Sequence, residues 1–245
     1  MKISLVDRII LTINKFLIIK TIRCFVAYVR YIFLRFFLRK NKIISNKKFF
    51  WGKDTFLHNY KKVVHSIFYH DRVLSLIRPT LAIQSVLINK PCLKVLSIGP
   101  RSESELLLLA AHGFSWKNIR GLDLFSYSPK IDVGDMHYLP YKNDSFDIIF
   151  SGWSLGYSDK QKLALNEMVR VLKNSGIIAF GQGHIPLNER KQNNWTGAKV
   201  VNNKIDKIFS PISKNIDNFF FRHEIDKEME KRGERAILAV FSIKK

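Results

Sequence analysis

From residue 94 onward, short apolar runs rich in Val, Ile and Phe alternate with segments of helical periodicity. The runs lie at 94–99, 119–124, 131–134, 146–150 and 177–180. Helices are expected at 102–112 and 159–173, each ended by a following glycine. Strands that alternate with helices pair in parallel, because each helix returns the chain to the starting end of the sheet. The sequence therefore predicts an α/β fold with a mostly parallel central sheet and helices on both faces. A helix near 219–232 and a strand at 236–243 should close the chain.

The regions that flank this alternating pattern differ from it in composition. Three parts are expected: a basic amphipathic arm at 1–50, a helical lead-in at 51–92, and the α/β domain at 93–245. Helices are expected in the lead-in at 58–77 and 81–89, with a break at Pro79. The polar segment 185–215 is rich in Asn and Lys and should form a long loop over the carboxyl edge of the sheet.

The net charge of the 245-residue chain is +21, and most of it lies in the N-terminal arm. Residues 1–62 contain fifteen Lys and Arg but only two acids, whereas acids and bases nearly balance over 94–184. A nucleic-acid-binding domain would carry basic residues over the domain itself, so this distribution argues against a nucleic-acid partner. The only two cysteines, Cys24 and Cys92, exclude a disulfide scaffold, and no metal site is expected.

The arm has helical periodicity up to about residue 34. At about 100° per residue its cations fall within an arc of roughly 140°, and most of its Ile, Phe and Leu lie outside that arc. These cations are Arg8, Lys15, Lys20, Arg23 and Arg30. No uncharged run reaches the ~20 residues of a spanning helix or the ~7–15 of a secretory signal.

A cationic amphipathic helix of this kind can lie in the interface of an anionic membrane. Residues 1–40 therefore suggest a cytoplasmic protein held peripherally at the inner face of a membrane. The alternative is that the helix packs on the α/β domain, with the stems of its lysines along the edge. The sequence leaves both readings open.

The first strand–turn–helix unit has the features of a nucleoside site. Its strand ends at Gly99, which lets the backbone approach a ligand closely, and a helix begins directly afterwards. Asp123 ends the second strand, 24 residues further on. A carboxylate at that place can accept both hydroxyls of a ribose. A further acid, Asp135, closes the third run.

A more specific pattern follows. Gly134-Asp-Met-His-Tyr-Leu-Pro140 leads through Asn143-Asp-Ser-Phe-Asp147 into a strand, and Glu167-Met-Val-Arg-Val-Leu172 precedes Gly176. In order and spacing, residues 93–184 resemble class I S-adenosylmethionine-dependent methyltransferases, especially the type 11 group. The resemblance implies the Rossmann-like fold of that family, S-adenosylmethionine as the cofactor, and methyl transfer as the reaction.

The resemblance also implies roles for individual residues. The expected cofactor-binding positions are Gly99, Pro100, Arg101, Asp123, Leu124, Asp135, Met136, Ser151 and Gly152. Gly99, Pro100 and Arg101 should meet the methionine part of the cofactor. Asp123 and Leu124 should meet the ribose, and Asp135 and Met136 the adenine. Ser151 and Gly152 should lie near the sulfonium. Trp153 and Tyr157 follow them, where an acceptor would stack.

The glycine loop departs from the family pattern at two places. Ser97 stands where the family has an acid, and Pro100 and Arg101 interrupt the glycines. Arg101 could pair with the cofactor carboxylate or with a nearby glutamate, Glu103 or Glu105. The altered loop leaves room for a non-catalytic relative that binds S-adenosylmethionine or another nucleoside. A nicotinamide-dependent dehydrogenase shares the sheet and the strand-end acid, but its GxGxxG pattern is missing here.

Methyl transfer to an oxygen needs a base, whereas an amine must only be neutral. His184, just after the fifth strand, is the expected base, and His137 is the second candidate. If residues 1–40 hold the chain at a membrane, the acceptor should be a small molecule at that surface, such as a lipid or a glycan precursor.

Overall fold

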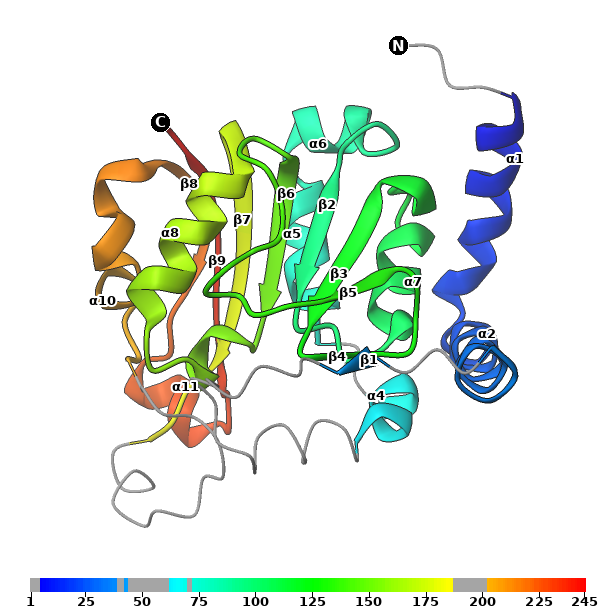
Figure 1. Cartoon of the computed structure of the whole chain (residues 1–245). Helices are drawn as coiled ribbons and strands as arrows, with labels where there is room; N and C mark the ends of the chain where they lie inside the picture. The colour runs from blue at the N-terminus through cyan, green and yellow to red at the C-terminus, as the bar shows by residue number, and fades with distance from the viewer. Residues whose placement is uncertain (1–4, 39–41, 44–61, 70–71, 187–201) are drawn as a thin grey trace.

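The computed structural model describes residues 5–38, 42–43, 62–69, 72–186 and 202–245. Its centre is a seven-stranded sheet in the order β5-β3-β2-β6-β7-β9-β8 (Figure 1). The strands are β2 Val95–Ile98, β3 Ile119–Asp123, β5 Ile131–Val133, β6 Phe146–Gly152, β7 Leu172–Gly183, β8 Ile216–His223 and β9 Ala236–Ile243. All neighbouring strands from β5 to β7 pair in parallel, and β9 is antiparallel to both β7 and β8. The predicted α/β fold with a mostly parallel sheet is confirmed.

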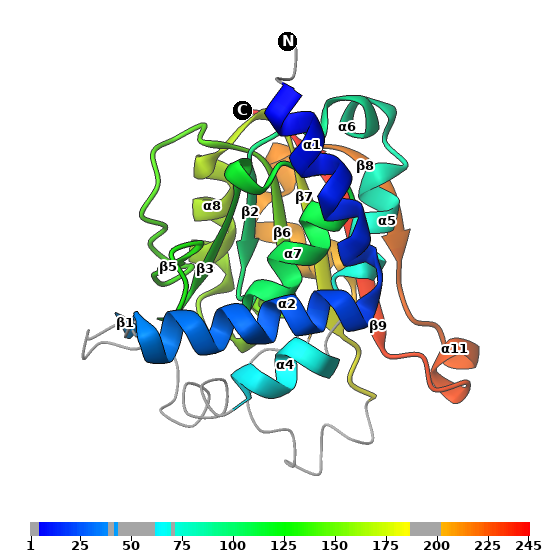
Figure 2. The same cartoon turned by 90° about the vertical axis from the view of Figure 1, so that its right-hand side faces the viewer.

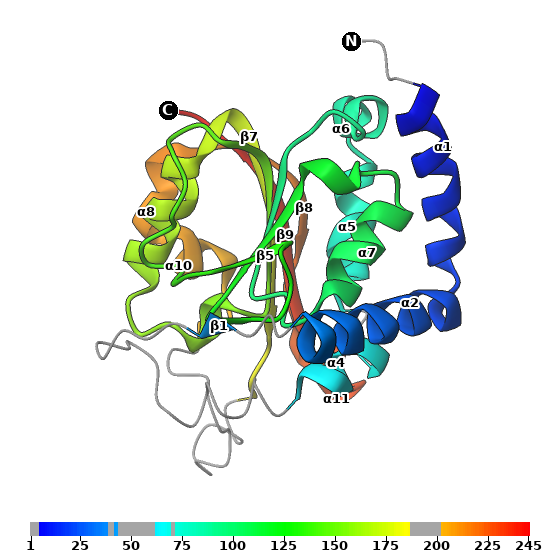
Figure 3. The ribbon, with the colours of Figure 1, turned by 45° about the vertical axis from the view of Figure 1, so that its right-hand side comes forward.

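Helices cover both faces of this sheet (Figure 3). One face carries α8 Gln161–Val171, α10 Ile205–Phe209 and the 3₁₀ helix η5 Ser210–Asn215. The other carries α5 Leu74–Leu81, α6 Gln84–Asn89 and α7 Glu103–Ala111. The central strands are therefore buried on both sides, which explains why they appear in the sequence as continuous apolar runs and do not alternate with polar residues.

Two expectations for the last third of the chain were wrong. Residues 219–232 do not form a helix: β8 extends to His223 and only Lys227–Lys231, α11, is helical. From Phe219 to His223 the residues pair with β9 and alternate between half-buried and exposed, as in a strand. Residues 205–215, expected in a loop, form α10 and η5. Four apolar side chains of this segment recur at helical spacing and are buried against the sheet: Ile205, Ile208, Phe209 and Ile212. The part of the expected loop at 187–201 lies outside the described residues.

The lead-in also divides differently from the expectation. The expected helix 58–77 contains α4 Val63–Tyr69 and the beginning of α5, while 58–61 and 70–71 lie outside the described residues. Pro79 does not end α5, which continues to Leu81. The hydroxyl of Thr80 donates to the Leu76 carbonyl at 2.7 Å, which satisfies a carbonyl of this last turn.

The N-terminal arm forms a third layer outside α7 (Figure 2). It consists of α1 Leu5–Asn14, the 3₁₀ turn η1 Lys15–Ile18, α2 Lys20–Ile32 and the π-helical turn η2 Phe33–Phe37. The expected single helix is interrupted at Ile19, whose extended backbone (ψ 113°) turns the chain, so α2 runs across the end of α1. A short pair of strands, β1 Lys42–Ile43 and β4 Phe125–Ser126, holds the end of the arm to the domain.

Two arginines of α2 face the domain. Arg23 is buried and donates to the Leu17 carbonyl at 2.9 Å, and Arg30 pairs with the buried Glu103 of α7. Cys24, Ala27 and other small or apolar side chains fill the same interface. The helix therefore packs on the domain through the face that carries these arginines, and much of its apolar face is exposed. None of the described helices has the length and apolar sequence needed to cross a bilayer.

Candidate functional site

A pocket lies where the carboxyl ends of β2, β3 and β6 meet, and it encloses about 870 Å³ including its open mouth. Parallel strands of an α/β sheet present their ligand sites at this edge. The pocket collects nine of the residues that the sequence assigned to cofactor or acceptor. These are Gly99, Pro100, Arg101, Asp123, Leu124, Met136, Gly152, Trp153 and Tyr157.

The loop between β2 and α7 forms one wall of this pocket. Gly99 has a positive φ of +74°, and a Cβ at this position would lie 2.9 Å from Cβ of Ser154. Only glycine fits both requirements without strain. Arg101 also has a positive φ, 56°, although it carries a side chain. The backbone therefore keeps a turn at the position where the family pattern has a further glycine, and Arg101 bears the conformational cost.

Asp123 forms the floor of the pocket beside this loop. Its carboxylate accepts from the backbone N–H of Arg101 at 3.0 Å and from that of Leu124 at 2.7 Å. Burial raises the pKa of Asp123, and these backbone donors oppose that rise. The carboxylate is thus fixed in orientation where it lines the pocket. This is the arrangement expected of a residue that accepts hydroxyl groups of a ribose.

Glu105 of α7 also lines the pocket, and the sequence analysis did not assign it a role in cofactor binding. The hydroxyl of Ser97 donates to its Oε1. Burial raises the pKa of Glu105 to about 7, while Ser97 and the nearby Arg72 favour the charged form. The acid missing from position 97 is therefore supplied from the facing helix, one hydrogen bond away. A glutamate eight residues after Ser97 was visible in the sequence, but only the packing of α7 on β2 brings the two together.

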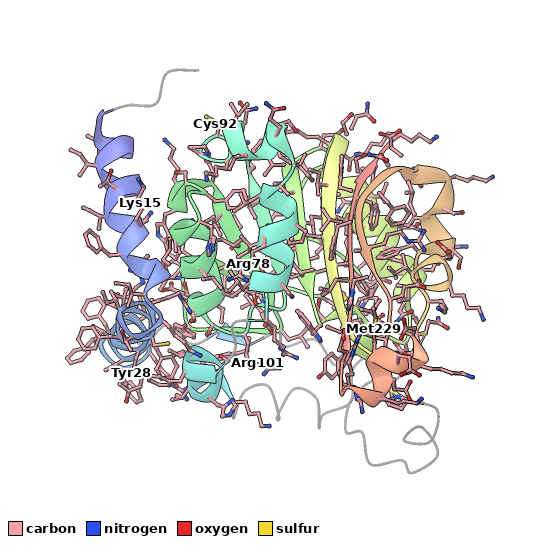
Figure 4. All side chains as sticks on the ribbon, turned by 180° about the vertical axis from the view of Figure 1, so that it is seen from behind. Lys15, Tyr28, Arg78, Cys92, Arg101 and Met229 are labelled. Atoms are coloured by element: carbon pink, nitrogen blue, oxygen red, sulfur yellow. The ribbon has the colours of Figure 1, made fainter. Side chains whose placement is uncertain are left out.

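The opposite wall belongs to residues that follow β6. Trp153 has a positive φ of 58° and lies against Gly181 of β7. The guanidinium of Arg72, from the turn before α5, lies 5.0 Å from the centre of the Trp153 ring. Burial and the nearby charge of Arg101 lower the pKa of Arg72. Arg72 was missed because it comes from the lead-in, where no motif marks it, and Figure 4 shows Arg101 close to that part of the chain.

Ser151, Asp135 and His184 were expected in the site but are not among the residues that line the pocket. Ser151 is buried and shares a hydrogen bond of 3.2 Å with Ser154, which does line the pocket. Asp135 accepts from the backbone N–H of His137 at 2.9 Å and contacts its Nδ1 at 2.5 Å. Its neighbours Gly134 and Met136 face the pocket in its place.

The two histidines considered as bases have other partners. His184 lies at the end of β7, where its Nε2 is 2.8 Å from a carboxylate oxygen of Glu230. Nε2 of the fully buried His137 is 2.6 Å from the Ser158 hydroxyl, and its other nitrogen meets Asp135. These contacts fix the loop after β5 to the one after β6. The structure does not bring His184 or His137 to the pocket, and the described residues that line it include no histidine.

The pocket fits the parts of S-adenosylmethionine. The glycine turn leaves space that a side chain would fill, Asp123 offers oriented acceptors for a ribose, and Glu105 offers a carboxylate for an ammonium group. Leu124 and Met136 give an apolar surface for a base. A sheet in this order, with an antiparallel strand inserted next to its end and a nucleoside pocket at the first glycine turn, defines the class I methyltransferase fold.

Comparison with known proteins agrees with this class. Residues 96–180 match the type 11 methyltransferase domain family. N-methyltransferase NodS from Bradyrhizobium japonicum, solved with S-adenosylhomocysteine, has a TM-score of 0.54 at 16% identity and covers 79% of this chain and 100% of its own. An S-adenosylmethionine-dependent methyltransferase from Aquifex aeolicus has a TM-score of 0.51 at 14% identity, covering 75% and 98%. These findings identify a class I S-adenosylmethionine-dependent methyltransferase domain within this chain, with S-adenosylmethionine as methyl donor.

One curated relative matches a shorter segment. Malonyl-[acyl-carrier protein] O-methyltransferase from Halorhodospira halophila is 36% identical over 52 residues, which is 21% of this chain and 18% of that protein. The chain thus matches less than a fifth of the length of this relative. The dehydrogenase alternative is not supported, because the dinucleotide-binding sheet is parallel in the order 3-2-1-4-5-6, whereas β9 here is antiparallel.

Proposed function

We propose that this chain transfers the methyl group of S-adenosylmethionine to a small-molecule acceptor bound at the mouth of the pocket beside Trp153 and Tyr157. The observation that carries the proposal is that one pocket joins the glycine turn and Asp123 to these two aromatic residues. The cofactor supplies a methyl carbon already activated by a sulfonium. The carbon–sulfur bond breaks as the acceptor atom bonds to carbon, and an acceptor that carries a proton gives it up to solvent or to a nearby group.

The protein contributes mainly alignment in such a displacement. Asp123 would fix the ribose and Glu105 the ammonium group, so the methyl carbon would face Trp153 and Tyr157. Arg72 lies over the Trp153 ring, and no ion pair joins it to another described residue. It is therefore placed to balance negative charge on an acceptor. Since neither His184 nor His137 lines the pocket, we favour an acceptor atom that reacts without either of them as a base.

The acceptor we propose is a lipid or a glycan precursor held at a membrane surface. The arm supports this idea by its position, since α2 contacts α4 and α4 contributes Ser66 to the pocket wall. The protein would then act peripherally at the cytoplasmic face of a membrane. The names of the matched proteins do not indicate this acceptor.

The test is calorimetric titration with S-adenosylmethionine and S-adenosylhomocysteine, followed by a labelled-methyl assay on lipid and glycan extracts. Asp123→Asn should weaken binding by about tenfold to a hundredfold, because a hydrogen bond to a charged group contributes about 1.5–3 kcal/mol. Asp206→Asn, an exposed aspartate of α10 outside the pocket, is the matched control and should leave binding unchanged.

The non-catalytic alternative gives a different result in the same experiment. It is favoured by one observation, the side chain that Arg101 carries in a backbone conformation suited to glycine. In that case the cofactor binds and Asp123→Asn weakens it, yet no labelled methyl group appears in any extract. Absence of binding by the folded wild-type protein would contradict both functions.

A further inference from the structure

The outward side of the N-terminal arm is apolar along its described length. Fourteen of the twenty large apolar side chains that are exposed in the described chain lie between residues 6 and 38. Phe16, Phe25 and Phe37 are 61%, 67% and 74% exposed. Monomeric soluble proteins rarely expose a contiguous apolar surface of this kind unless a partner covers it. We call these fourteen side chains the apolar face of the arm.

The inward side of α2 uses its cations for contacts within the chain. Arg23 is buried against the Leu17 carbonyl, and both sides of the Arg30 guanidinium meet Glu103, at 2.5 and 3.1 Å. Cys24 of α2 donates to the Ile67 carbonyl of α4 at 3.1 Å. The arm is therefore held with one orientation, and its outward residues are set by the fold. A nucleic acid could not reach Arg23 or pair with Arg30 without displacing Glu103.

The apolar face is broad and does not form a single narrow seam. α1 stands along the side of the domain and α2 crosses its lower end, and side chains of both helices extend away from the sheet (Figures 2 and 4). Ile9 and Ile13 of α1 and Val29 of α2 are all about half exposed or more. Helix-in-groove and coiled-coil partners instead use one stripe along one helix. Two crossing helices with outward apolar side chains fit an extended, flat partner.

The charge of the arm favours an anionic partner. In the sequence, residues 8–38 contain six Lys and Arg and no Asp or Glu. Lys15 and Lys20 flank the turn between the two helices and are exposed. A second copy of the chain would bring two such cationic arms together, and their charges would repel. A surface that combines exposed Phe and Ile with lysines matches the headgroup region of an anionic bilayer.

We propose that the apolar face of the arm docks into the interfacial region of an anionic lipid bilayer, with α1 and α2 lying on its surface. Docking would bring the pocket near an acceptor held at the membrane, and this consequence rests on the proposed function. Docking itself requires neither cofactor nor methyl transfer. Because the arm is fixed to α4 and α7, it would orient the whole domain and not act as a loose tether.

Flotation of the full chain with vesicles tests the proposal. The vesicles are phosphatidylcholine alone, or phosphatidylcholine with 30% phosphatidylglycerol, a composition chosen for about one anionic lipid in three. Wild-type protein should float with the anionic vesicles. The variant Phe16→Ser/Phe25→Ser/Phe37→Ser should partition at least tenfold less, and Lys15→Glu/Lys20→Glu should lose the preference for anionic vesicles. Leu87→Ser/Ile88→Ser, which removes exposed apolar side chains from α6, is the matched control and should float like wild type.

The outcomes separate docking from catalysis. Titration with S-adenosylhomocysteine is run on every variant, and unchanged binding shows that the pocket is intact. A triple variant that binds the cofactor but stays at the bottom of the gradient supports docking. Wild-type protein that remains unbound to both vesicles, or a triple variant that floats as well as wild type, overturns it. Wild-type dimers that the triple variant abolishes, without flotation of either, would also overturn it, because a second copy would then cover the face.

Discussion

Glu105 is a buried acid at the pocket that accepts a hydrogen bond from Ser97. Its pKa is raised from 4.5 to about 7 because its carboxyl group is buried beside Ser97. The folded protein therefore holds a proton that the unfolded chain releases between these two pH values. Stability should fall as pH rises through this window, since the charged form is disfavoured in the fold.

Glu105→Gln should remove this pH dependence. The variant should match wild type near pH 5 and exceed its unfolding free energy by about 1–2 kcal/mol at pH 8, a value reduced for partial exposure to the pocket. Urea denaturation at both pH values measures the difference. Affinity for S-adenosylhomocysteine should rise from pH 6 to 8 in wild type only, whereas 5′-methylthioadenosine, which lacks the ammonium group, should show no such rise. Equal pH profiles for the two proteins would show that Glu105 does not meet the ammonium group.

The sequence correctly predicted the position of the pocket residues that belong to the motif at the ends of the parallel strands. Gly99 and Asp123 follow strands, so their place at the carboxyl edge followed from the strand pattern alone. Arg72 reaches the pocket from the turn before α5 and Glu105 from α7, and a single sequence does not specify those side-chain directions. His184 follows a strand as well, yet it pairs with Glu230 of α11, a long-range contact that the sequence does not reveal even though a helix was expected there.

Strand β7 packs against Trp153, which lines the pocket. Trp153 donates its backbone N–H to the Gly181 carbonyl at 2.7 Å, and a Cβ on Gly181 would lie 3.0 Å from the indole ring. Gly181→Ala should therefore push the indole toward the pocket. Tryptophan fluorescence should shift and cofactor affinity should fall by about threefold to tenfold, or up to about 1.4 kcal/mol.

Gly183→Ala on the same strand is the control for this prediction. A Cβ on Gly183 meets its nearest atom, the Arg235 carbonyl oxygen, at 4.0 Å. It should leave fluorescence and binding unchanged. If both alanine variants behave alike, the effect comes from the strand and not from contact with Trp153.

An ion pair joins α2 to α7 beside their apolar contacts. Glu103 is fully buried, and besides Arg30 its carboxylate is held by the hydroxyl of Ser128. Arg30→Ala should lower the unfolding free energy by about 1–3 kcal/mol, because an unpaired buried charge remains. Glu103→Gln in the Arg30→Ala background should recover part of this loss. Chemical denaturation of both single variants and the double variant gives the coupling energy, and additive effects would show that the pair does not stabilise the contact. Lys15→Ala, an exposed cation of the same arm, should change stability little.

The elements that the sequence predicted correctly are those whose period is unambiguous. The parallel strands are rich in Val, Ile, Leu and Phe, and Gly113 follows the end of α7. Gly176, expected to end α8, instead lies within β7, which begins directly after that helix. β8 was read as a helix because Phe219 to Phe221 gave a short apolar run that periodicity alone does not resolve. In the arm the periodicity was recognised, but the direction of the cations was not, because it depends on Glu103, 73 residues after Arg30.

The whole molecule has one layer of helices beyond the α/β domain, and the N-terminal arm forms it. Leu107 and Ala111 of α7 and Phe125 and Tyr127 pack against α2 and α4, in a core separate from those of the sheet. The ring of Tyr31 meets that of Tyr127 at 4.9 Å, edge to face. The arm therefore contributes buried surface to the fold, and the sequence boundary between arm and domain does not mark an independent appendage.

Removal of residues 1–38 tests whether arm and domain unfold as one unit. The truncation opens a core to which six buried apolar side chains from outside the arm belong, and it leaves Glu103 without Arg30. Each large apolar side chain contributes about 1.5–3 kcal/mol when buried, so the truncated chain should lose several kcal/mol and unfold at a clearly lower temperature. Scanning calorimetry of the full chain should give one transition whose calorimetric and van't Hoff enthalpies agree. Two separate transitions, or a truncated chain that unfolds at the temperature of the full chain, would mean that the arm is only attached to the domain. In that case the fold would not fix the orientation of the arm. The apolar face would then be attached to the domain flexibly and not rigidly.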